Sequence, residues 1–317
     1  MSATRRKLLI DTDAGVDDAQ AILMALQAPD VDVIGITCVM GNADVEQVGL
    51  NVLRILKVVD RLDIPVFIGC NEPLLGDKKP TSDYHGLDGF GDAPDEDAPD
   101  KSHLQSEHAV MALVRIAKEH EGEVTLACIG PLTNVAMAIR MDSKFGSRFK
   151  GCYIMGGNHE GKGNMTTSAE FNFYSDPEAA YVVLNQLKTP ITIVTWETCE
   201  KHSLPWEFYH KIRRNDNAIT NFLRKIEKLS EKYAIEHKWD TFIPCDEVLV
   251  ACFLNHDVIK SSADVYATVE VKGQYTWGQM VVDWNSVLKK NKNVKIVTNI
   301  DQTVYENILI KLVSNKN

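Results

Sequence analysis

Short apolar runs alternate with longer segments of helical periodicity through the first two thirds of this 317-residue chain. Six runs rich in Val, Ile and Thr are typical of buried strands: Lys7–Ile10, Val33–Thr37, Pro65–Ile68, Val124–Ile129, Cys152–Met155 and Ile191–Thr195. Five segments between them have helical periodicity: Asp18–Gln27, Val45–Val59, Ser106–His120, Leu132–Met141 and Pro177–Leu187. This alternation predicts an α/β fold whose open, mostly parallel sheet is covered by helices on both faces.

The last third of the chain has a different pattern. Pro205–Trp239 is helical and charged, and we expect it to stand over the sheet. Val265–Val271 and Met280–Trp284 are typical of a strand pair, and Val304–Leu312 of a terminal helix. Because no linker separates two parts, we predict one domain over residues 1–317, a Rossmann-like sheet with extra C-terminal helices and strands. Ligands of such sheets bind at the carboxyl ends of the strands.

Charge and cysteine usage limit the partners and the compartment. The net charge of -10 argues against binding to nucleic acid or to an anionic membrane surface. No stretch approaches the roughly 18 apolar residues of a membrane span, and no apolar signal core follows Arg5 and Arg6. The seven cysteines are scattered through apolar segments without a CxxC pair. These features predict a cytoplasmic protein.

The segment Asn71–Ser102 is long, irregular and rich in turn residues. Loops of this length inside compact domains are usually functional or disordered. Its acidic part, Asp92–Asp100, is typical of a solvated surface, whereas Tyr84–Gly91 is the better candidate for part of a site.

Four carboxylates follow the first predicted strand within eight residues: Asp11, Asp13, Asp17 and Asp18. One aspartate would be enough to cap the next helix. Four in one loop repel one another, and a bound cation relieves that repulsion. Carboxylate oxygens favour hard ions, so the cluster predicts a Ca²⁺ or Mg²⁺ site.

Two motifs with such clusters match poorly. An EF-hand loop starting at Asp11 requires Gly at its sixth position and Glu at its twelfth, where this chain has Val16 and Ile22. A DxD-type Mg²⁺ phosphatase would use Asp11 as nucleophile and Asp13 as general acid, but Gly15 stands where Thr or Val is expected. The phosphatase stays open as an alternative.

A third pattern matches throughout: the chain resembles the nucleoside hydrolase family, whose N-terminal signature is DxDxGxDDAxA. Asp11–Ala21 matches each fixed position of that signature. Further similarities follow in family order across roughly residues 7–250: Gly41-Asn42, His85-Gly86 with Asp88-Gly89, Gly130–Asn134, Met155–Gly157, Asn164, Ala169–Asn172, Asp176–Ala180 and Asp246.

The resemblance implies that Ca²⁺ is held by Asp13, Asp18, Asp246 and the backbone carbonyl of Ile129. Asp13 would also act as general base toward a Ca²⁺-bound water that attacks the N-glycosidic bond. Taken alone, Asp246 is better explained as the N-cap of a helix over Glu247–Leu254, and the resemblance reverses that interpretation.

The same resemblance places five polar side chains around a ribose: Asp17, Asn42, Asn164, Glu170 and Asn172. Carboxylates and amides bind sugar hydroxyls because they accept or donate hydrogen bonds. Since a missing hydroxyl leaves buried partners unpaired, we expect ribonucleosides to be preferred over deoxyribonucleosides.

For the departing base, this chain departs from the best-characterised branch of the family. That branch has a proton-donating His just before the C-terminal metal-binding Asp, where this chain has Cys245. A thiol is a weak hydrogen-bond donor, so base preference and the identity of the acid stay open. His85 is the leading alternative donor, and His237 and Tyr233 are others.

Aromatic side chains are candidates for stacking on a base: Tyr84, Phe90, Trp239 and Phe242. We assign Trp196 and Trp206 to structural packing instead.

The sequence therefore predicts a nucleoside N-ribohydrolase that uses Ca²⁺ and takes part in nucleoside catabolism or salvage. The resemblance also implies a homodimer or homotetramer. Besides the phosphatase, a non-catalytic nucleoside-binding homologue, silenced at Cys245, stays open. The base and the physiological riboside stay undetermined.

Overall fold

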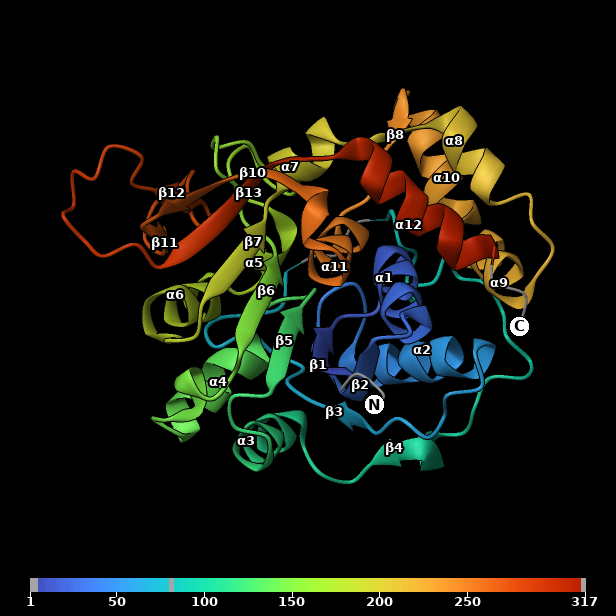
Figure 1. Ribbon diagram of the computed structural model, residues 1–317, viewed down its shortest axis with the longest axis horizontal. Helices are drawn as coiled ribbons and strands as arrows, with labels where there is room; N and C mark the ends of the chain where they lie inside the picture. The colour runs from blue at the N-terminus through green and yellow to red at the C-terminus, as the bar shows by residue number, and fades with distance from the viewer. Residues whose placement is uncertain (1–4, 80–82, 315–317) are drawn as a thin grey trace.

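A computed structural model describes residues 5–79 and 83–314 (Figure 1). Its main sheet has the strand order β10-β13-β7-β6-β5-β1-β2-β3-β4. All neighbours in this sheet are parallel except β10 and β13. The strands are β1 (Arg6–Thr12), β2 (Val31–Cys38), β3 (Val66–Ile68), β4 (Leu104–Gln105), β5 (Val124–Cys128), β6 (Gly151–Met155), β7 (Ile191–Val194), β10 (Ile259–Val265) and β13 (Val294–Ile300). This confirms the predicted α/β class.

Helices cover both faces of the sheet, as Figure 1 shows. On one face lie α3 (Ala109–Glu119), α4 (Thr133–Met141) and α6 (Pro177–Gln186). On the other lie α1 (Val16–Gln27), α2 (Val45–Val58), α11 (Asp246–Leu254) and α12 (Gln302–Ser314). Their apolar sides pack on strand residues that are buried on both faces of the sheet, which explains the continuous apolar runs of the central strands.

The sheet reverses its winding between β1 and β5. From β1 the chain builds β2, β3 and β4 on one side, and then β5, β6 and β7 on the other. Asp11 at the end of β1 pairs with Cys128 at the end of β5, and the Ile129 amide donates to the Asp11 carbonyl at 2.8 Å. The crevice beyond these two strand ends is where such sheets bind ligands.

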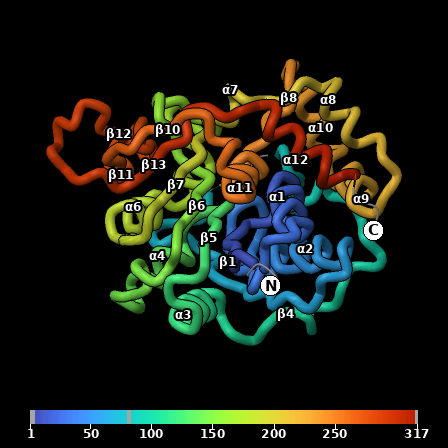
Figure 2. The backbone as a smooth tube through the Cα atoms, viewed as in Figure 1, coloured from blue at the N-terminus to red at the C-terminus, as the bar shows by residue number. Residues whose placement is uncertain are grey.

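The C-terminal third is helical where expected and adds strands to the main sheet. Pro205–Trp239 contains three short helices, α8 (Trp206–Ile212), α9 (Ala218–Ile226) and α10 (Lys228–Glu236). The strand pair exists as a separate antiparallel sheet of β11 (Ala267–Val269) and β12 (Met280–Val282), whereas β10 and β13 were not predicted and extend the main sheet. The chain between β12 and β13 projects from the body beside them (Figure 2). Short elements complete the chain: α5 (Phe171–Ser175), α7 (Trp196–Lys201), β8 (Leu204–Pro205) and β9 (Thr241–Phe242).

The long irregular segment has little regular structure, as predicted, but it is anchored; its residues 80–82 lie outside the described part. Arg54 on α2 is buried, pairs with Asp95 at 3.2 Å and donates to the Ala93 carbonyl at 3.0 Å. Asn51, one turn earlier, donates to the carbonyls of Asp88 (2.7 Å) and Ala14 (3.2 Å). The acidic stretch Asp92–Asp100 is therefore not only a solvated surface, because part of it is bound to α2.

Across residues 5–79 and 83–314, no helix is both long and apolar enough to cross a membrane. The seven cysteines are free thiols, six of them buried. The organisation of residues 1–317 as one domain stays a prediction.

Candidate active site

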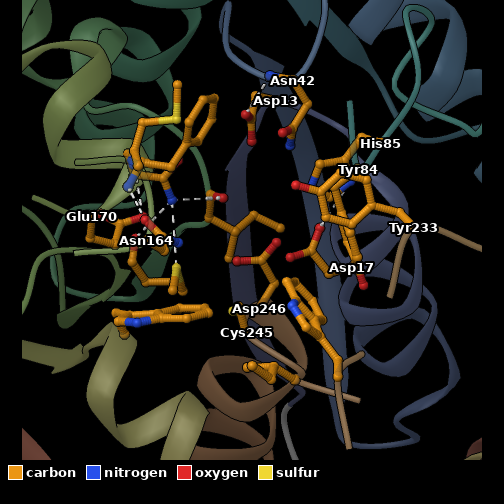
Figure 3. Close-up of a pocket in the computed structure, with 18 residues that line it drawn as sticks. Asp13, Asp17, Asn42, Tyr84, His85, Asn164, Glu170, Tyr233, Cys245 and Asp246 are labelled. Carbon is orange, nitrogen blue, oxygen red and sulfur yellow. Dashed lines mark hydrogen bonds and ion pairs between the residues drawn. The ribbon is translucent and has the colours of Figure 1, made fainter. Parts of the chain in front are cut away.

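A cavity of about 340 Å³ opens at the carboxyl ends of the central strands. Figure 3 shows Asn164 and Glu170 on one side, Tyr84, His85 and Tyr233 on the other, and Asp13, Asp17 and Asp246 between them. The lining residues come from segments far apart in sequence: Asp13, Asp17, Asn42, Tyr84, His85, Ile129, Met155, Asn164, Met165, Glu170, Phe171, Asn172, Trp196, Tyr233, Trp239, Ile243, Cys245 and Asp246.

The turn after β1 directs the aspartates into this cavity. Ala14 adopts a φ of 36°, and its amide donates to Thr12 Oγ1 at 3.0 Å. The Gly15 amide donates to Asp18 Oδ2 at 2.8 Å, which fixes the start of α1. A Cβ on Gly15 would lie 2.8 Å from His85 Nδ1 and 2.5 Å from Asn42 Nδ2, so glycine is required by close approach.

Asp17, Asp18 and Asp246 place carboxylate oxygens within 4.8 Å of one another. Asp18 and Asp246 are buried, and burial together with the neighbouring aspartate charges raises the pKa of both, that of Asp18 to about 8. The repulsion between these buried carboxylates is relieved either by protonation or by a bound cation. Asp246 is the first residue of α11, and no side chain caps that helix, so the N-cap interpretation of Asp246 is wrong.

Asp13 stands beside this cluster. Its Oδ2 accepts the Asn42 amide at 2.8 Å, while its Oδ1 is buried and has no hydrogen-bond partner among the described residues. Burial, followed by the charge of Asp18, raises its pKa well above the usual range. A buried carboxylate oxygen without a donor is the kind of group that a cation satisfies.

Two glycines make room for the Asp13 side chain. A Cβ on Gly41, in the loop after β2, would lie 2.0 Å from Asp13 Oδ2. A Cβ on Gly130, after β5, would lie 2.8 Å from Asp13 Oδ1. Asp13, in the loop after β1, is thus packed closely between the loops after β2 and β5.

Asp11 lies behind the cavity and does not line it. Its Oδ1 accepts the Thr37 hydroxyl at 2.6 Å and the Asn134 amide group at 2.9 Å. Burial raises its pKa to about 7, although these two hydrogen bonds oppose the shift. Asn134 also donates to the Cys38 carbonyl at 2.9 Å, so Asp11 links the ends of β1 and β2 to the start of α4, and a nucleophilic role for Asp11 has no geometric support.

Amide and carboxyl groups form the wall that contains Glu170. Both Glu170 oxygens accept backbone amides: Oε2 from Gly157 at 2.7 Å and Phe173 at 3.1 Å, Oε1 from Asn172 at 2.7 Å. Burial outweighs these bonds and raises the Glu170 pKa to about 7. The Asn172 side chain donates to the Met155 carbonyl at 3.1 Å and the Ile129 carbonyl at 3.4 Å, which turns it toward the cavity floor.

The opposite wall is aromatic. Tyr84 stacks on Trp239 with ring centroids 5.7 Å apart and meets Tyr233 edge-on at 5.8 Å. The Ser230 hydroxyl of α10 donates to the Tyr84 carbonyl at 2.6 Å, so α10 and the long loop form this wall together.

The Val16 amide donates to His85 Nδ1 at 3.2 Å, which leaves the proton of the neutral ring on Nε2. Burial lowers the His85 pKa, with Asp17 partly opposing it.

Cys245 lines the cavity beside Asp246. The nearby Cys199 thiol and burial raise the pKa of Cys245 well above its usual range, so the group is a neutral thiol. Its backbone amide donates to Glu247 Oε2 at 3.0 Å, which holds the turn into α11. A neutral, weakly donating thiol is poorly suited to protonate a leaving base.

Several aromatic expectations need correction. Phe90 is fully buried and Phe242 packs against Tyr209, so neither lines the cavity. His237 is exposed and stacks on Tyr233 outside it. Trp196, assigned above to packing, lines the cavity at the start of α7. Its place directly after β7, at a carboxyl end of the sheet, was the signal that should have identified it.

The structure brings together Asp13, Asp17, Asn42, His85, Ile129, Asn164, Glu170, Asn172, Cys245 and Asp246 around one cavity. Asp18 lies within the carboxylate cluster just behind it. A cation-binding acidic floor, a polar wall and an aromatic wall suit a ligand with a sugar at one end and a flat ring at the other.

Comparisons with known proteins agree with this geometry. Residues 8–307 match the family model described as inosine-uridine preferring nucleoside hydrolase. An inosine-uridine preferring nucleoside hydrolase of Leishmania major is 30% identical over 93% of both chains. A pyrimidine-specific ribonucleoside hydrolase of Escherichia coli O1:K1 / APEC is 31% identical over 95% of this chain and 96% of its own. The structure of an inosine-guanosine nucleoside hydrolase superposes with a TM-score of 0.93 at 32% identity, covering 99% of this chain and 100% of the other.

Proposed function

The chain belongs to the inosine-uridine preferring nucleoside hydrolase family, and from this premise we propose that it hydrolyses the N-glycosidic bond of ribonucleosides to free base and ribose. One observation supports this most: a single cavity holds buried aspartates, ribose-compatible Asn and Glu side chains, and an aromatic wall. The phosphatase alternative does not explain that combination, because a phosphatase needs no aromatic wall and Asp11, its nucleophile, is outside the cavity. A silenced homologue would share this cavity, so only turnover separates it from the hydrolase.

We propose Ca²⁺ as the metal of the acidic floor. The residues fit it: Asp13 Oδ1 is buried without a donor, and Asp17, Asp18 and Asp246 converge beside it. The candidate ligands are Asp13, Asp18, Asp246 and the Ile129 carbonyl, all hard oxygen donors. When bound, Ca²⁺ would polarise a water and keep these carboxylates ionised. Asp17 is close enough to contribute to the same site.

Asp13 is the proposed general base. The Asn42 amide donates to its Oδ2, and the backbones of Gly41 and Gly130 pack so close to the carboxylate that neither position has space for a Cβ. Its Oδ1 is therefore the oxygen available to accept a proton from the attacking water. Asp17, Asn42, Asn164, Glu170 and Asn172 are the proposed ribose contacts, and they orient the sugar over this oxygen.

The departing base is assigned to the aromatic wall. Tyr84, Tyr233 and Trp239 offer ring faces to a flat heterocycle, and Trp196 adds another indole to the lining. His85 is the proposed hydrogen-bond donor to the base through Nε2, because Nδ1 is occupied by the Val16 amide. The relatives are named for different bases, so the base is left to experiment. A homodimer or homotetramer and a cytoplasmic location stay predictions.

The test is release of free ribose from inosine, adenosine, guanosine, uridine and cytidine with Ca²⁺ present, compared with release of 2-deoxyribose from the 2′-deoxy form of the best substrate. We expect release from at least one ribonucleoside and at least about tenfold less from its 2′-deoxy form, because buried partners of the 2′-hydroxyl would be left unpaired. Tight binding of a nucleoside without any release would instead support the silenced homologue.

A further inference from the structure

Glu197 is a buried carboxylate that faces away from the cavity, toward the loop between β6 and α5. Its Oε2 accepts the His159 amide at 2.8 Å and lies 3.3 Å from His159 Nδ1. Its Oε1 accepts the amides of Glu160 at 2.8 Å and Lys162 at 3.2 Å. Both oxygens are thus fully used by one short stretch of loop.

The loop that Glu197 holds leads directly to the polar wall of the cavity. Gly157, at its start, donates to Glu170 Oε2 at 2.7 Å and accepts the Trp196 amide at 3.0 Å. The Asn158 side chain closes the loop by donating to the carbonyls of Lys162 at 3.0 Å and Ser168 at 2.7 Å. Asn164 lies inside the closed part.

The β11–β12 hairpin and the residues directly after it contact the same loop from its other side. The Met280 amide on β12 donates to Asn158 Oδ1 at 2.9 Å. The Trp284 indole N–H donates to the His159 carbonyl at 3.3 Å, and its ring meets the His159 ring edge-on. With the hairpin on one side and Glu197 on the other, the loop has few alternative conformations.

The ionised form of Glu197 suits this role. Burial alone would raise its pKa, but the His159 side chain and the amides of His159 and Glu160 outweigh burial and lower the pKa to about 2. The carboxylate is therefore an acceptor at both oxygens throughout the neutral range. A glutamine would turn one oxygen into an NH₂ group that faces amide donors, leaving at least one of these backbone N–H groups without its acceptor.

We infer that Glu197 is a positioning residue: by accepting the backbone amides of residues 159, 160 and 162, it fixes the loop that presents Asn164 and Glu170 to the ribose. The inference rests on the proposed function, because it assumes that a ribose occupies the polar wall. Glu197 itself does not line the cavity, and its hydrogen bonds reach the polar wall through this loop.

The test compares Glu197→Gln with Glu160→Gln, the same change made on the loop itself at a side chain that is 57% exposed. Four quantities are measured with Ca²⁺ present: KM and kcat for the best ribonucleoside, the dissociation constant of free ribose by calorimetry, Ca²⁺ affinity, and stability to urea. For Glu197→Gln we expect KM and the ribose dissociation constant to rise together by about tenfold, with kcat within about threefold and Ca²⁺ affinity unchanged. Glu197→Asp, which keeps two acceptor oxygens, should recover part of the ribose affinity.

Loss of stability with an unchanged ribose dissociation constant would overturn the inference, because Glu197 would then only support the fold. If the wild-type protein releases no ribose but still binds it, the proposed function fails, and weaker ribose binding in Glu197→Gln still supports the positioning role. Wild-type protein that neither hydrolyses nucleosides nor binds ribose would overturn both.

Discussion

At the scale of single residues, the proposed chemistry depends on which atoms the fold leaves without partners. Asp13 Oδ1 is buried and lacks a donor, whereas Asp11, two residues earlier, is occupied by Thr37 and Asn134. The same aspartate-rich motif therefore contains a structural acid, Asp11, and the acid that we propose to be the general base, Asp13. Their difference comes from neighbours on β2 and α4, which sequence spacing alone does not specify.

Replacing His85 tests the assignment of the base contact. His85→Ala should lower kcat on inosine by about 100-fold or more, because the leaving base loses its hydrogen-bond donor. Release of 4-nitrophenol from 4-nitrophenyl riboside should fall by less than about tenfold, since that group leaves as a stable anion without protonation. Equal losses on both substrates would show that His85 does not act on the leaving group.

Glu197 also makes a prediction about acid stability. Its folded pKa of about 2 lies below the ordinary 4.5, so between these values the unfolded chain binds the proton first. Its contribution to stability is fully present above about pH 4.5 and is lost as the pH falls toward 2, with a slope of up to about 1.4 kcal/mol per pH unit. Urea unfolding at pH 3 to 5 should give a shallower pH dependence for Glu197→Gln than for wild type. Parallel curves would contradict the assigned pKa.

Some site residues could be predicted from the sequence and others could not. The aspartates, Glu170 and Asn172 belong to motifs with fixed spacing, and the structure places them around one cavity or directly behind it. Trp196 was assigned to packing, although its place after β7 pointed to the ligand-binding edge of the sheet. Trp239 and Tyr233 were candidates from the sequence, as a stacking ring and as a proton donor, and both line the cavity. Their meeting with Tyr84 in one wall depends on the contact of α10 with the long loop, a tertiary contact without a local sequence signal.

At the scale of elements, the central strands and their helices were predicted because each has a strong local pattern and is buried. The strands β10 and β13 were not. β13 has the alternating sequence Val-Lys-Ile-Val-Thr-Asn-Ile, a strand signal, but only its pairing with β7 shows that it extends the main sheet. The irregular loop of residues 71–102 was recognised, whereas its anchoring by Arg54 depends on long-range contacts.

The loops after β2 and β5 give a prediction about close approach. Gly41→Ala would place a Cβ 2.0 Å from Asp13 Oδ2, so Asp13 must move and kcat should fall by about 100-fold. Gly151→Ala at the start of β6 is the matched control, because no atom lies within 4 Å of its added Cβ. Kinetics and urea unfolding of both variants check this. Full activity in a folded Gly41→Ala protein would contradict this prediction, because it would show that Asp13 can move without loss of turnover.

At the scale of the whole molecule, the acidic floor joins β1, α1 and α11, so a cation bound there should stabilise the entire fold. Ca²⁺ at 100 times its dissociation constant should add about 2.7 kcal/mol to the free energy of unfolding, and chelator should remove it. Thermal melts with Ca²⁺ or chelator measure this effect. Asp246→Asn should lose most of the Ca²⁺-dependent shift, and an undiminished shift in that variant would place the ion elsewhere.

The most direct test of the central claim, that a metal-dependent carboxylate at the end of β1 drives ribonucleoside hydrolysis, is ribose release by wild type and Asp13→Asn. Both proteins are incubated with the preferred ribonucleoside in Ca²⁺ and in chelator. We predict release by wild type in Ca²⁺, its loss in chelator, and at least about a 100-fold lower kcat for Asp13→Asn with nucleoside binding retained. Release that resists chelator, or that persists in Asp13→Asn, would contradict the account.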